Sequence, residues 1–330
     1  MPQISERGLQ MPASPIRKLA PLSDKAKARG VKVYHLNIGQ PDLPTPQVAL
    51  DAIKSIDRTT LEYSPSDGYL FYRENLVKYY DSFDIKLSPD QIIVTAGGSE
   101  AVLYAFMACL NPGDEILVSE PAYANYMAFA VSAGAIIKTI PTSIETGFKL
   151  PSFGELENLI TPKTKGILIC NPNNPTGYVY TADEMEKIRK LVIKYNLFLF
   201  SDEVYREFIY SDAPYISACH LEGVEDNVVL IDSVSKRYSE CGIRIGCLIT
   251  KNKKVHETVM KFCQARLSPP LIGQIVANAS LQVDEKYMQT NFEEYRNRRD
   301  FLIEKLNKIP GVKAPTPMGA FYTVASLPVD

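Results

Sequence analysis

The 330-residue sequence lacks the marks of a membrane or secreted protein. It has no run of about eighteen apolar residues, the length that a helix needs to cross a bilayer. Residues 1–30 mix proline, arginine and lysine and contain no apolar segment of the kind found in secretory signals. These absences predict a cytoplasmic protein that has no membrane partner.

A surplus of charge and a metal-binding pattern are also missing. The 36 lysines and arginines nearly balance the 38 aspartates and glutamates, and long blocks of one sign do not occur. This balance gives no attraction for nucleic acid, so we expect no nucleic-acid partner. The six cysteines form no CxxC pair and the three histidines stand far apart, which predicts reduced thiols and no metal site.

Short apolar runs alternate with helical or loop segments from residue 90 onward. Buried strands of a parallel sheet have this near-continuous apolar character. The runs cover residues 92–95, 115–119, 135–140, 166–170, 197–201, 228–231 and 245–249. They predict an α/β fold whose large domain holds a mostly parallel, seven-stranded sheet between helices.

The connection between the last two runs predicts one strand of opposite direction. Residues 232–244 carry no helical pattern and are about as few as a parallel crossover can use. We therefore expect residues 245–249 to run antiparallel to their neighbours. Elsewhere, Thr181 and Glu184 fit a capping box, which predicts a helix from that point.

The two ends of the chain have a different pattern, and we expect them to form a smaller domain. The predicted elements are a short strand over residues 32–37, helices over 47–56, 72–80 and 287–309, and two short strands within 312–324. We divide the chain into a large domain, residues 46–284, and a small α/β domain of residues 1–45 and 285–330. Too little chain follows residue 324 to cover the last strands, so the small domain is expected to be incomplete.

The candidate for chemistry is Lys236, in a hydroxylic loop directly behind the apolar run 228–231. Open α/β sheets bind their ligands at the ends of strands. A lone lysine is nevertheless most often a solvated surface residue. The assignment therefore depends on what the other strand ends carry.

Two further strand ends carry glycine and amide groups. Gly97, Gly98 and Ser99 lead from an apolar run into a helix, and such a turn can bind phosphate through free N–H groups. A plain tight turn is the alternative. Asn174 lies in a rigid turn between prolines, where its amide can donate a hydrogen bond to a ligand oxygen; an Asx turn is the alternative.

An acidic and a basic residue complete the set. Asp202 ends the run 197–201, with Tyr205 three residues on, and a carboxylate there can keep a ring nitrogen protonated. A helix N-cap is the alternative. Arg244 can pair with a phosphate beside Ser233 and Ser235, and a surface cation is the alternative.

A phosphate cradle, an amide donor, a carboxylate, an amine and an arginine at strand ends are the parts needed to hold pyridoxal phosphate. In this combination the chain resembles the class I and II aminotransferases, pyridoxal-phosphate enzymes with the aspartate aminotransferase fold (fold type I). The motifs that carry the resemblance are Asn37-Ile38-Gly39-Gln40-Pro41-Asp42, Asn173-Asn174-Pro175-Thr176-Gly177, Ser201-Asp202-Glu203-Val204-Tyr205 and Ser233-Val234-Ser235-Lys236 with Arg244-Ile245-Gly246.

The resemblance implies a role for each of these residues. Lys236 would join the cofactor covalently, Asp202 would pair with its ring nitrogen, and Asn174 and Tyr205 would hydrogen-bond its ring oxygen, which makes Lys236, Asp202 and Tyr205 the expected catalytic residues. Tyr123 would stack on the ring. The residues expected at the phosphate are Gly97, Gly98, Ser99, Ser233, Ser235, Arg244 and, from the neighbouring subunit of a homodimer, Tyr63.

Substrate binding is less well defined by the motifs. Gly39 matches a loop glycine near the substrate carboxylate, and Asn174 is expected beside it. The family's carboxylate-binding arginine lies well beyond the segment that resembles residues 319–322, yet no arginine follows Arg299. Either the sequence is a fragment that lacks the last part of the small domain, or the substrate carboxylate is bound differently, and the uncovered strands favour the fragment. Arg266 is a candidate second cation for a dicarboxylic substrate, and a helix-face cation is the alternative.

The resemblance implies ping-pong transfer of an amino group between an amino acid and a 2-oxo acid. Aspartate and 2-oxoglutarate are the first candidates for this pair. Aromatic or alanine-type donors stay open, as does a C–S β-lyase on the same scaffold. Residues 233–236 also fit the S-x-x-K signature of serine acyl transferases, but the companion S-D-N and K-T-G motifs are absent. An aminotransferase-like sensor would need a DNA-binding module, for which the chain has neither length nor charge.

Overall fold

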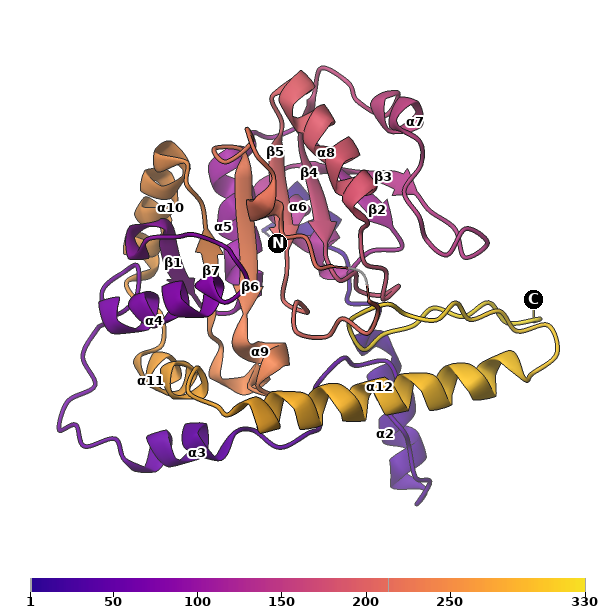
Figure 1. Cartoon of the computed structure of the whole chain (residues 1–330), viewed down its shortest axis with the longest axis horizontal. Helices are drawn as coiled ribbons and strands as arrows, with labels where there is room; N and C mark the ends of the chain where they lie inside the picture. The colour runs from indigo at the N-terminus through magenta and orange to yellow at the C-terminus, as the bar shows by residue number, and fades with distance from the viewer. Residues whose placement is uncertain (1, 213, 330) are drawn as a thin grey trace.

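The computed structural model describes residues 2–212 and 214–329, and its centre is one seven-stranded sheet (Figure 1). The strand order is β1-β7-β6-β5-β4-β2-β3. The strands are β1 (Ile92–Thr95), β2 (Glu115–Glu120), β3 (Ile136–Pro141), β4 (Thr164–Cys170), β5 (Phe198–Asp202), β6 (Val228–Ser233) and β7 (Gly246–Ile249). All neighbours pair in parallel except β7, which is antiparallel to both β1 and β6. The predicted α/β fold and its one reversed strand are confirmed.

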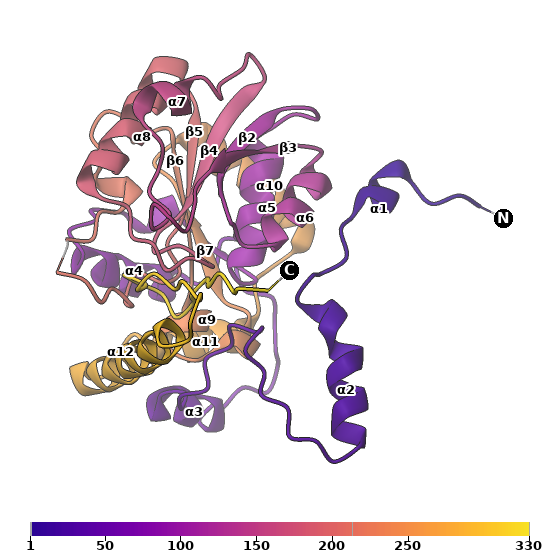
Figure 2. The same cartoon turned by 90° about the vertical axis from the view of Figure 1, so that its right-hand side faces the viewer.

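Helices cover both faces of the sheet (Figures 1 and 2). One face packs against α5 (Gly98–Cys109), α6 (Asn125–Ala133) and α10 (Lys253–Arg266). The other face packs against α4 (Leu70–Asp81) and α8 (Ala182–Tyr195). Because both faces are covered, β1, β5, β6 and β7 are buried over almost their whole length, whereas the edge strand β3 is largely exposed.

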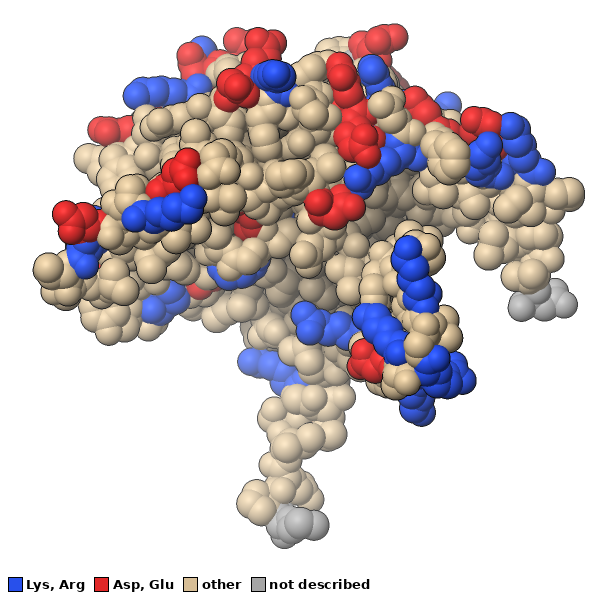
Figure 3. All heavy atoms as spheres, turned by 90° about the horizontal axis from the view of Figure 1, so that it is seen from below, with Lys and Arg blue, Asp and Glu red and all other residues tan. Residues whose placement is uncertain are grey.

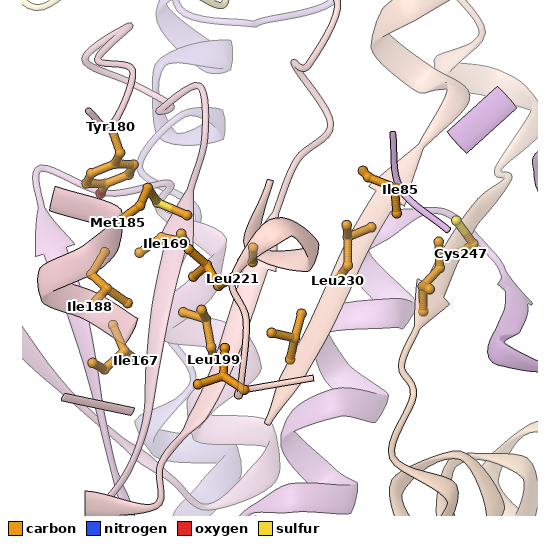
Figure 4. Close-up of a cluster of buried hydrophobic side chains, with 14 of the residues drawn as sticks. Ile85, Ile167, Ile169, Tyr180, Met185, Ile188, Leu199, Leu221, Leu230 and Cys247 are labelled. Carbon is orange, nitrogen blue, oxygen red and sulfur yellow. The ribbon is translucent and has the colours of Figure 1, made fainter. Parts of the chain in front are cut away.

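Figure 4 shows the core beneath α8. Ile167, Ile169 and Leu199 of the sheet meet Met185 and Ile188 of the helix, and all five are buried. Full burial of each such side chain contributes about 1.5–3 kcal/mol. This layer fixes the position of the strand ends of β4 and β5.

The predicted capping box at the start of α8 is confirmed. The Thr181 side chain accepts a hydrogen bond from the backbone N–H of Glu184, and the Glu184 carboxylate accepts one from the N–H of Thr181. At its other end α8 stops at Asn196, which adopts the left-handed conformation.

Two strand predictions were wrong. Residues 32–37 form no strand, because no neighbouring strand pairs with them and Leu36 remains 93% exposed. Residues 312–324 form only isolated bridges, Ile209 to Gly319 and Lys313 to Ser326. Prolines 315 and 317 remove two N–H donors from this stretch, so a regular ladder cannot form.

Four further helices lie below the sheet in Figure 1: α3 (Gln47–Lys54), α9 (Val234–Arg237), α11 (Leu271–Ser280) and the long α12 (Glu285–Asn307). The short α7 (Phe153–Glu157) lies at the opposite end, beside α8. The predicted helices over residues 47–56, 72–80 and 287–309 correspond to α3, α4 and α12. In the described ranges, no helix is both long enough and apolar enough to span a membrane.

The N-terminal arm projects from the body of the molecule (Figure 2). It carries α1 (Glu6–Gln10) and α2 (Ala20–Ala28), neither of which has a buried residue. Lysine and arginine side chains gather on the projecting segment around α2 (Figure 3), among them Arg17, Lys18, Lys25 and Lys27. The arm therefore has little contact with its own chain.

Candidate active site

The polar residues singled out in the sequence lie at one edge of the sheet. In the parallel pairs, Cys170 of β4 is the partner of Asp202, and Asp202 is the partner of Ile231 in β6. At the reversed strand, Gly246 is the partner of both Thr95 and Ser233. The carboxyl ends of β1, β4, β5 and β6 thus meet here.

A tight cradle forms between the β1–α5 turn and Arg244. Gly97 adopts a φ of 83°, and a side chain there would overlap the Arg244 guanidinium. A Cβ on Gly246 would lie 2.6 Å from the amide nitrogen of Gly98. Gly98 and Ser99 begin α5, whose first N–H groups have no partner within the helix. The cradle therefore combines a guanidinium with a helix N-terminus, a suitable arrangement for an anion.

Ser233 and Ser235 stand beside this cradle on the turn between β6 and α9. The Ser233 Oγ lies 2.8 Å from the Ser235 Oγ and 2.9 Å from the Ile245 carbonyl oxygen. Both serines are buried. Arg244 itself donates to the carbonyl oxygens of Cys241, at 2.9 Å, and Ala96, at 3.3 Å.

Lys236 lies in α9, directly after this turn. Its Nζ donates a hydrogen bond of 2.7 Å to the carbonyl oxygen of Gly39 and lies 4.0 Å from the Sγ of Cys241. Burial lowers the pKa of the Lys236 amine, because desolvation disfavours its charged form. A larger neutral fraction makes the amine a better nucleophile and base.

Asp202 is a buried carboxylate whose charge is poorly compensated. Tyr126 OH donates to its Oδ2 at 2.6 Å, and the N–H of Val204 donates to its Oδ1 at 3.4 Å. Burial is the largest influence and raises the pKa of Asp202 to about 6, with further increases from Asp232 and Glu203. A cationic or N–H group of a ligand would therefore be favoured here.

Asn174 and Tyr205 are brought together as the sequence predicts. The Asn174 side-chain amide donates to the Tyr205 hydroxyl at 3.2 Å. The Tyr205 hydroxyl also lies 2.8 Å from the hydroxyl of Tyr322, a residue that the sequence reasoning gave no role. Tyr322 is 117 positions away from Tyr205, and no local pattern indicates their contact.

Tyr123 is half-buried and lies two residues before α6. Its hydroxyl accepts a hydrogen bond of 2.7 Å from Asn125, and its ring meets Tyr126 edge to face at 5.3 Å. Tyr126 was also missed. Its spacing of three residues from Tyr123 in a helical stretch is the signal that could have placed it on the same side.

The three remaining predicted residues, Gly39, Tyr63 and Arg266, differ in their surroundings. Gly39 contacts Lys236 through its carbonyl oxygen, whereas Tyr63 is 75% exposed. Arg266 forms an ion pair of 2.9 Å with Glu100 and donates to the carbonyl oxygen of Ser66 at 2.7 Å. These contacts favour the structural alternative for Arg266.

Beneath the site lies a buried ionic network that the sequence did not indicate. Arg206 pairs with Glu203 at 3.0 Å and with Asp232 at 3.3 Å. Arg237, next to Lys236, pairs with Asp232 and, at 3.1 Å, with Glu207. All these side chains are less than a tenth exposed. The network connects the end of β5 with the turn that carries Lys236.

Comparisons with known proteins agree with this geometry. The family model described as "Aminotransferase class I and II" matches residues 31–330. The chain is 37% identical over 315 residues to an aspartate aminotransferase of Thermotoga maritima, covering 93% of this chain and 81% of that relative. It is 30% identical over 328 residues to an aspartate/prephenate aminotransferase of Thermus thermophilus, covering 96% of this chain and 84% of that relative.

Solved structures give the same result. The crystal structure of an aspartate aminotransferase from Thermotoga maritima superposes with a TM-score of 0.92 at 33% identity, covering 99% of this chain and 86% of that one. An alanine aminotransferase from Pyrococcus furiosus superposes with a TM-score of 0.91 at 30% identity, covering 99% and 85%. With the family match over residues 31–330, they show that the chain belongs to the class I and II aminotransferases and is a transferase.

Proposed function

We propose that this aminotransferase uses pyridoxal phosphate to move an amino group between aspartate and 2-oxoglutarate. The observation that carries the proposal is the placing of Lys236 at the same sheet edge as the buried Asp202 and the Gly97–Arg244 cradle. These three features supply an amine, a carboxylate and an anion site within one structural unit.

The residues fit the cofactor in three respects. The cradle of Gly97, the α5 N-terminus and Arg244 suits a phosphate, because backbone N–H groups and a guanidinium both favour negative charge. Asp202, with its raised pKa, suits a protonated ring nitrogen, which would restore its ionised form. Asn174 and Tyr205 place an amide and a hydroxyl together, as a ring oxygen requires.

The chain's own residues then have defined tasks. Bound pyridoxal phosphate supplies an electron sink for the negative charge that forms at the substrate α-carbon. Asp202 maintains that sink by holding the ring nitrogen protonated. Lys236 takes the proton from the substrate α-carbon, and its lowered pKa increases the fraction of amine able to do so. Tyr123 restricts the ring from one side.

Aspartate and 2-oxoglutarate are proposed because two of the relatives are named aspartate aminotransferase or aspartate/prephenate aminotransferase. Gly39 contacts Lys236 and Asn174 contacts Tyr205, so both lie where a substrate carboxylate would approach. Arg266 is less suited to a second carboxylate, since Glu100 already pairs with it.

The test is a substrate comparison with purified protein and pyridoxal phosphate. Formation of glutamate from aspartate plus 2-oxoglutarate, and none from either alone, is the expected result. Alanine and phenylalanine as donors measure selectivity. Release of ammonia and pyruvate from a cysteine-type substrate without any oxo acid would instead indicate a β-lyase and contradict the proposal.

The assembly and the division into domains are further parts of the proposal. A homodimer would bring Tyr63 of one subunit to the phosphate cradle of the other, and the 75% exposure of Tyr63 is consistent with this. We propose a large domain of residues 46–284 and a small one of residues 1–45 and 285–330, whose termini Met1 and Asp330 lie outside the described residues. A cytoplasmic location stays a prediction from the sequence.

A further inference from the structure

The hydroxyl of Tyr322 lies where three distant parts of the chain meet. It is 2.8 Å from the Tyr205 hydroxyl, a pair in which either oxygen can donate, and 3.4 Å from the Gly39 carbonyl oxygen, to which its single hydrogen could be donated instead. That carbonyl oxygen accepts the 2.7 Å hydrogen bond from Lys236 Nζ, and the Tyr205 hydroxyl accepts one of 3.2 Å from Asn174. Four polar contacts thus join Asn174 to Lys236 through Tyr322.

The ring of Tyr322 has little freedom to move. It stacks on Phe321, with ring centroids 5.2 Å apart, and meets Tyr205 edge to face at 5.4 Å. On its remaining side it fills the space that a side chain on Gly39 would need. Glycine at position 39 is therefore required for this packing.

The backbone leading to Tyr322 is anchored to the body of the protein. Met318 and Gly319 donate hydrogen bonds of 2.8 and 2.9 Å to the carbonyl oxygen of Gly177, in the turn that holds Asn174. Ala320 donates one of 2.8 Å to the carbonyl oxygen of Phe208, just beyond Tyr205. The same two segments that present Asn174 and Tyr205 therefore also fix Tyr322.

The order of donors in this chain has a chemical consequence. The Tyr205 hydroxyl has one hydrogen to donate, and its oxygen already accepts a hydrogen bond from Asn174. If Tyr205 donated to Tyr322, it would have no hydrogen left for a ligand. If Tyr322 instead directs its single hydrogen to Tyr205, at 2.8 Å, rather than to the more distant Gly39 oxygen, at 3.4 Å, the Tyr205 hydrogen is free for a ligand. The Tyr205 hydroxyl is then a stronger donor, because consecutive hydrogen bonds polarise one another.

We propose that Tyr322 is a positioning residue of the active site, whose hydroxyl donates to Tyr205 and so directs the Tyr205 hydrogen to the ring oxygen of the cofactor. This inference rests on the proposed use of pyridoxal phosphate. Tyr322 itself acts only through Tyr205. A donor at the ring oxygen stabilises negative charge there, and the charge state of the cofactor thus reports on Tyr322.

The experiment is a pH titration of the absorption spectrum of the holoenzyme, comparing wild type with Tyr322→Phe. The substitution keeps the stacked ring and removes only the hydroxyl. Loss of one donor interaction makes the negative charge on the ring oxygen less stable, so the protonated form persists to higher pH. We expect the midpoint to rise by about 0.4–1 pH units, the equivalent of one hydrogen bond.

Two comparisons separate this role from a structural one. Tyr178→Phe is the matched control, because it removes another buried tyrosine hydroxyl, which donates a hydrogen bond of 2.8 Å to Glu184 at the start of α8, and it should leave the midpoint unchanged. Tyr205→Phe should shift the midpoint further, and the double variant Tyr205→Phe/Tyr322→Phe should titrate like Tyr205→Phe alone.

The outcomes distinguish this inference from the function on which it rests. A wild type that titrates, together with an unshifted Tyr322→Phe variant or an additive double variant, overturns the role of Tyr322 alone. A wild type that takes up no pyridoxal phosphate and shows no new absorption band overturns both. Circular dichroism of each variant verifies that the fold is retained.

Discussion

Lys236 shows how its surroundings change the chemistry of a common side chain. A solvated lysine is protonated at neutral pH, whereas burial lowers the pKa of this amine and Gly39 accepts one of its hydrogens. The short α9 helix begins just before it, with Ser233 as the N-cap residue. The position of the amine is therefore set by the turn rather than by the flexible side chain alone.

Replacement of Lys236 by alanine should remove turnover while leaving the cradle able to bind the cofactor. We expect aspartate-dependent turnover to fall by at least about 100- to 10,000-fold, the usual contribution of a general base. Borohydride treatment followed by mass spectrometry should attach the cofactor to wild type and not to the variant. Lys254→Ala, on the exposed start of α10, is the control; full activity of Lys236→Ala would refute the assignment.

Asp202 predicts a pH dependence of stability in the cofactor-free protein. Its pKa is raised from 3.8 to about 6, so the folded state holds this proton more tightly than the unfolded state does. The stabilisation is complete below pH 4 and is lost as the pH rises through about 6, amounting to at most about 3 kcal/mol.

Urea unfolding of apo wild type and apo Asp202→Asn across this pH range provides the measurement. The asparagine variant does not titrate, so wild type should lose stability relative to it between about pH 4 and pH 6. Bound cofactor should reverse the trend, because a protonated ring nitrogen favours the ionised carboxylate. A constant difference between the two apo proteins would show that Asp202 keeps its ordinary pKa.

Among the elements, the β6–α9 turn depends on charges that are fully withdrawn from water. Two arginines and three carboxylates share the buried network, and Tyr80 donates a hydrogen bond of 2.5 Å to Asp232 within it. Removing one partner from such a network leaves an uncompensated buried charge. Substitutions in this buried network should therefore destabilise the turn that carries Lys236.

The predicted effect of Arg237→Ala is a loss of about 3–5 kcal/mol in the free energy of unfolding. Urea unfolding of the apo-protein measures it. Arg298→Ala is the matched control, since Arg298 pairs with Asp42 and Glu294 at a position 44% exposed and should cost less than about 1 kcal/mol. Similar losses of unfolding free energy in both variants would mean that the buried ion pairs contribute no more to stability than the exposed ones.

The capping box of α8 allows a smaller and more local prediction. Thr181→Ala removes the acceptor for the Glu184 N–H and should reduce stability by about 1 kcal/mol. Thr181→Ser keeps the hydroxyl and should retain most of it. Thermal unfolding of the two variants provides the comparison, and equal melting temperatures would refute the contribution of the cap.

The strands and the residues at their ends could be predicted because their signals are local. Apolar runs mark the strands, and Gly97, Asp202 and Lys236 each lie at or just beyond the end of one. The contact of Tyr322 with Tyr205 could not be predicted, since it depends on the path of the whole chain. The strand predicted over residues 32–37 was wrong because a local signal was not enough. Their composition suits a strand, but among the described residues no neighbouring strand pairs with them.

For the molecule as a whole, exposed apolar residues in the segments before α3 and after it favour association of two copies. Tyr34, Leu36, Leu61 and Tyr63 are each more than 60% exposed. Burying such side chains is the main driving force of protein association. This agrees with the proposed homodimer, in which Tyr63 would reach the second cradle.

Light scattering coupled to size exclusion should therefore give a mass of twice 36.8 kDa. Tyr63→Phe should preserve this dimer but weaken cofactor binding, because only the hydroxyl that would reach the phosphate is removed. Arg29→Ala, in the exposed arm, is a control for the cofactor measurement. A monomer that binds the cofactor as tightly as the family's enzymes do would contradict the shared site.

The position of β7 has a consequence for the time course of folding. This strand is the last of the seven along the chain, yet it lies between β1 and β6 and brings Arg244 to Gly97. During synthesis, the ribosome releases six strands before the one that closes the anion site. Contacts across such long sequence separations form late. Uptake of the cofactor by a nascent chain should thus begin only once residue 249 has left the exit tunnel.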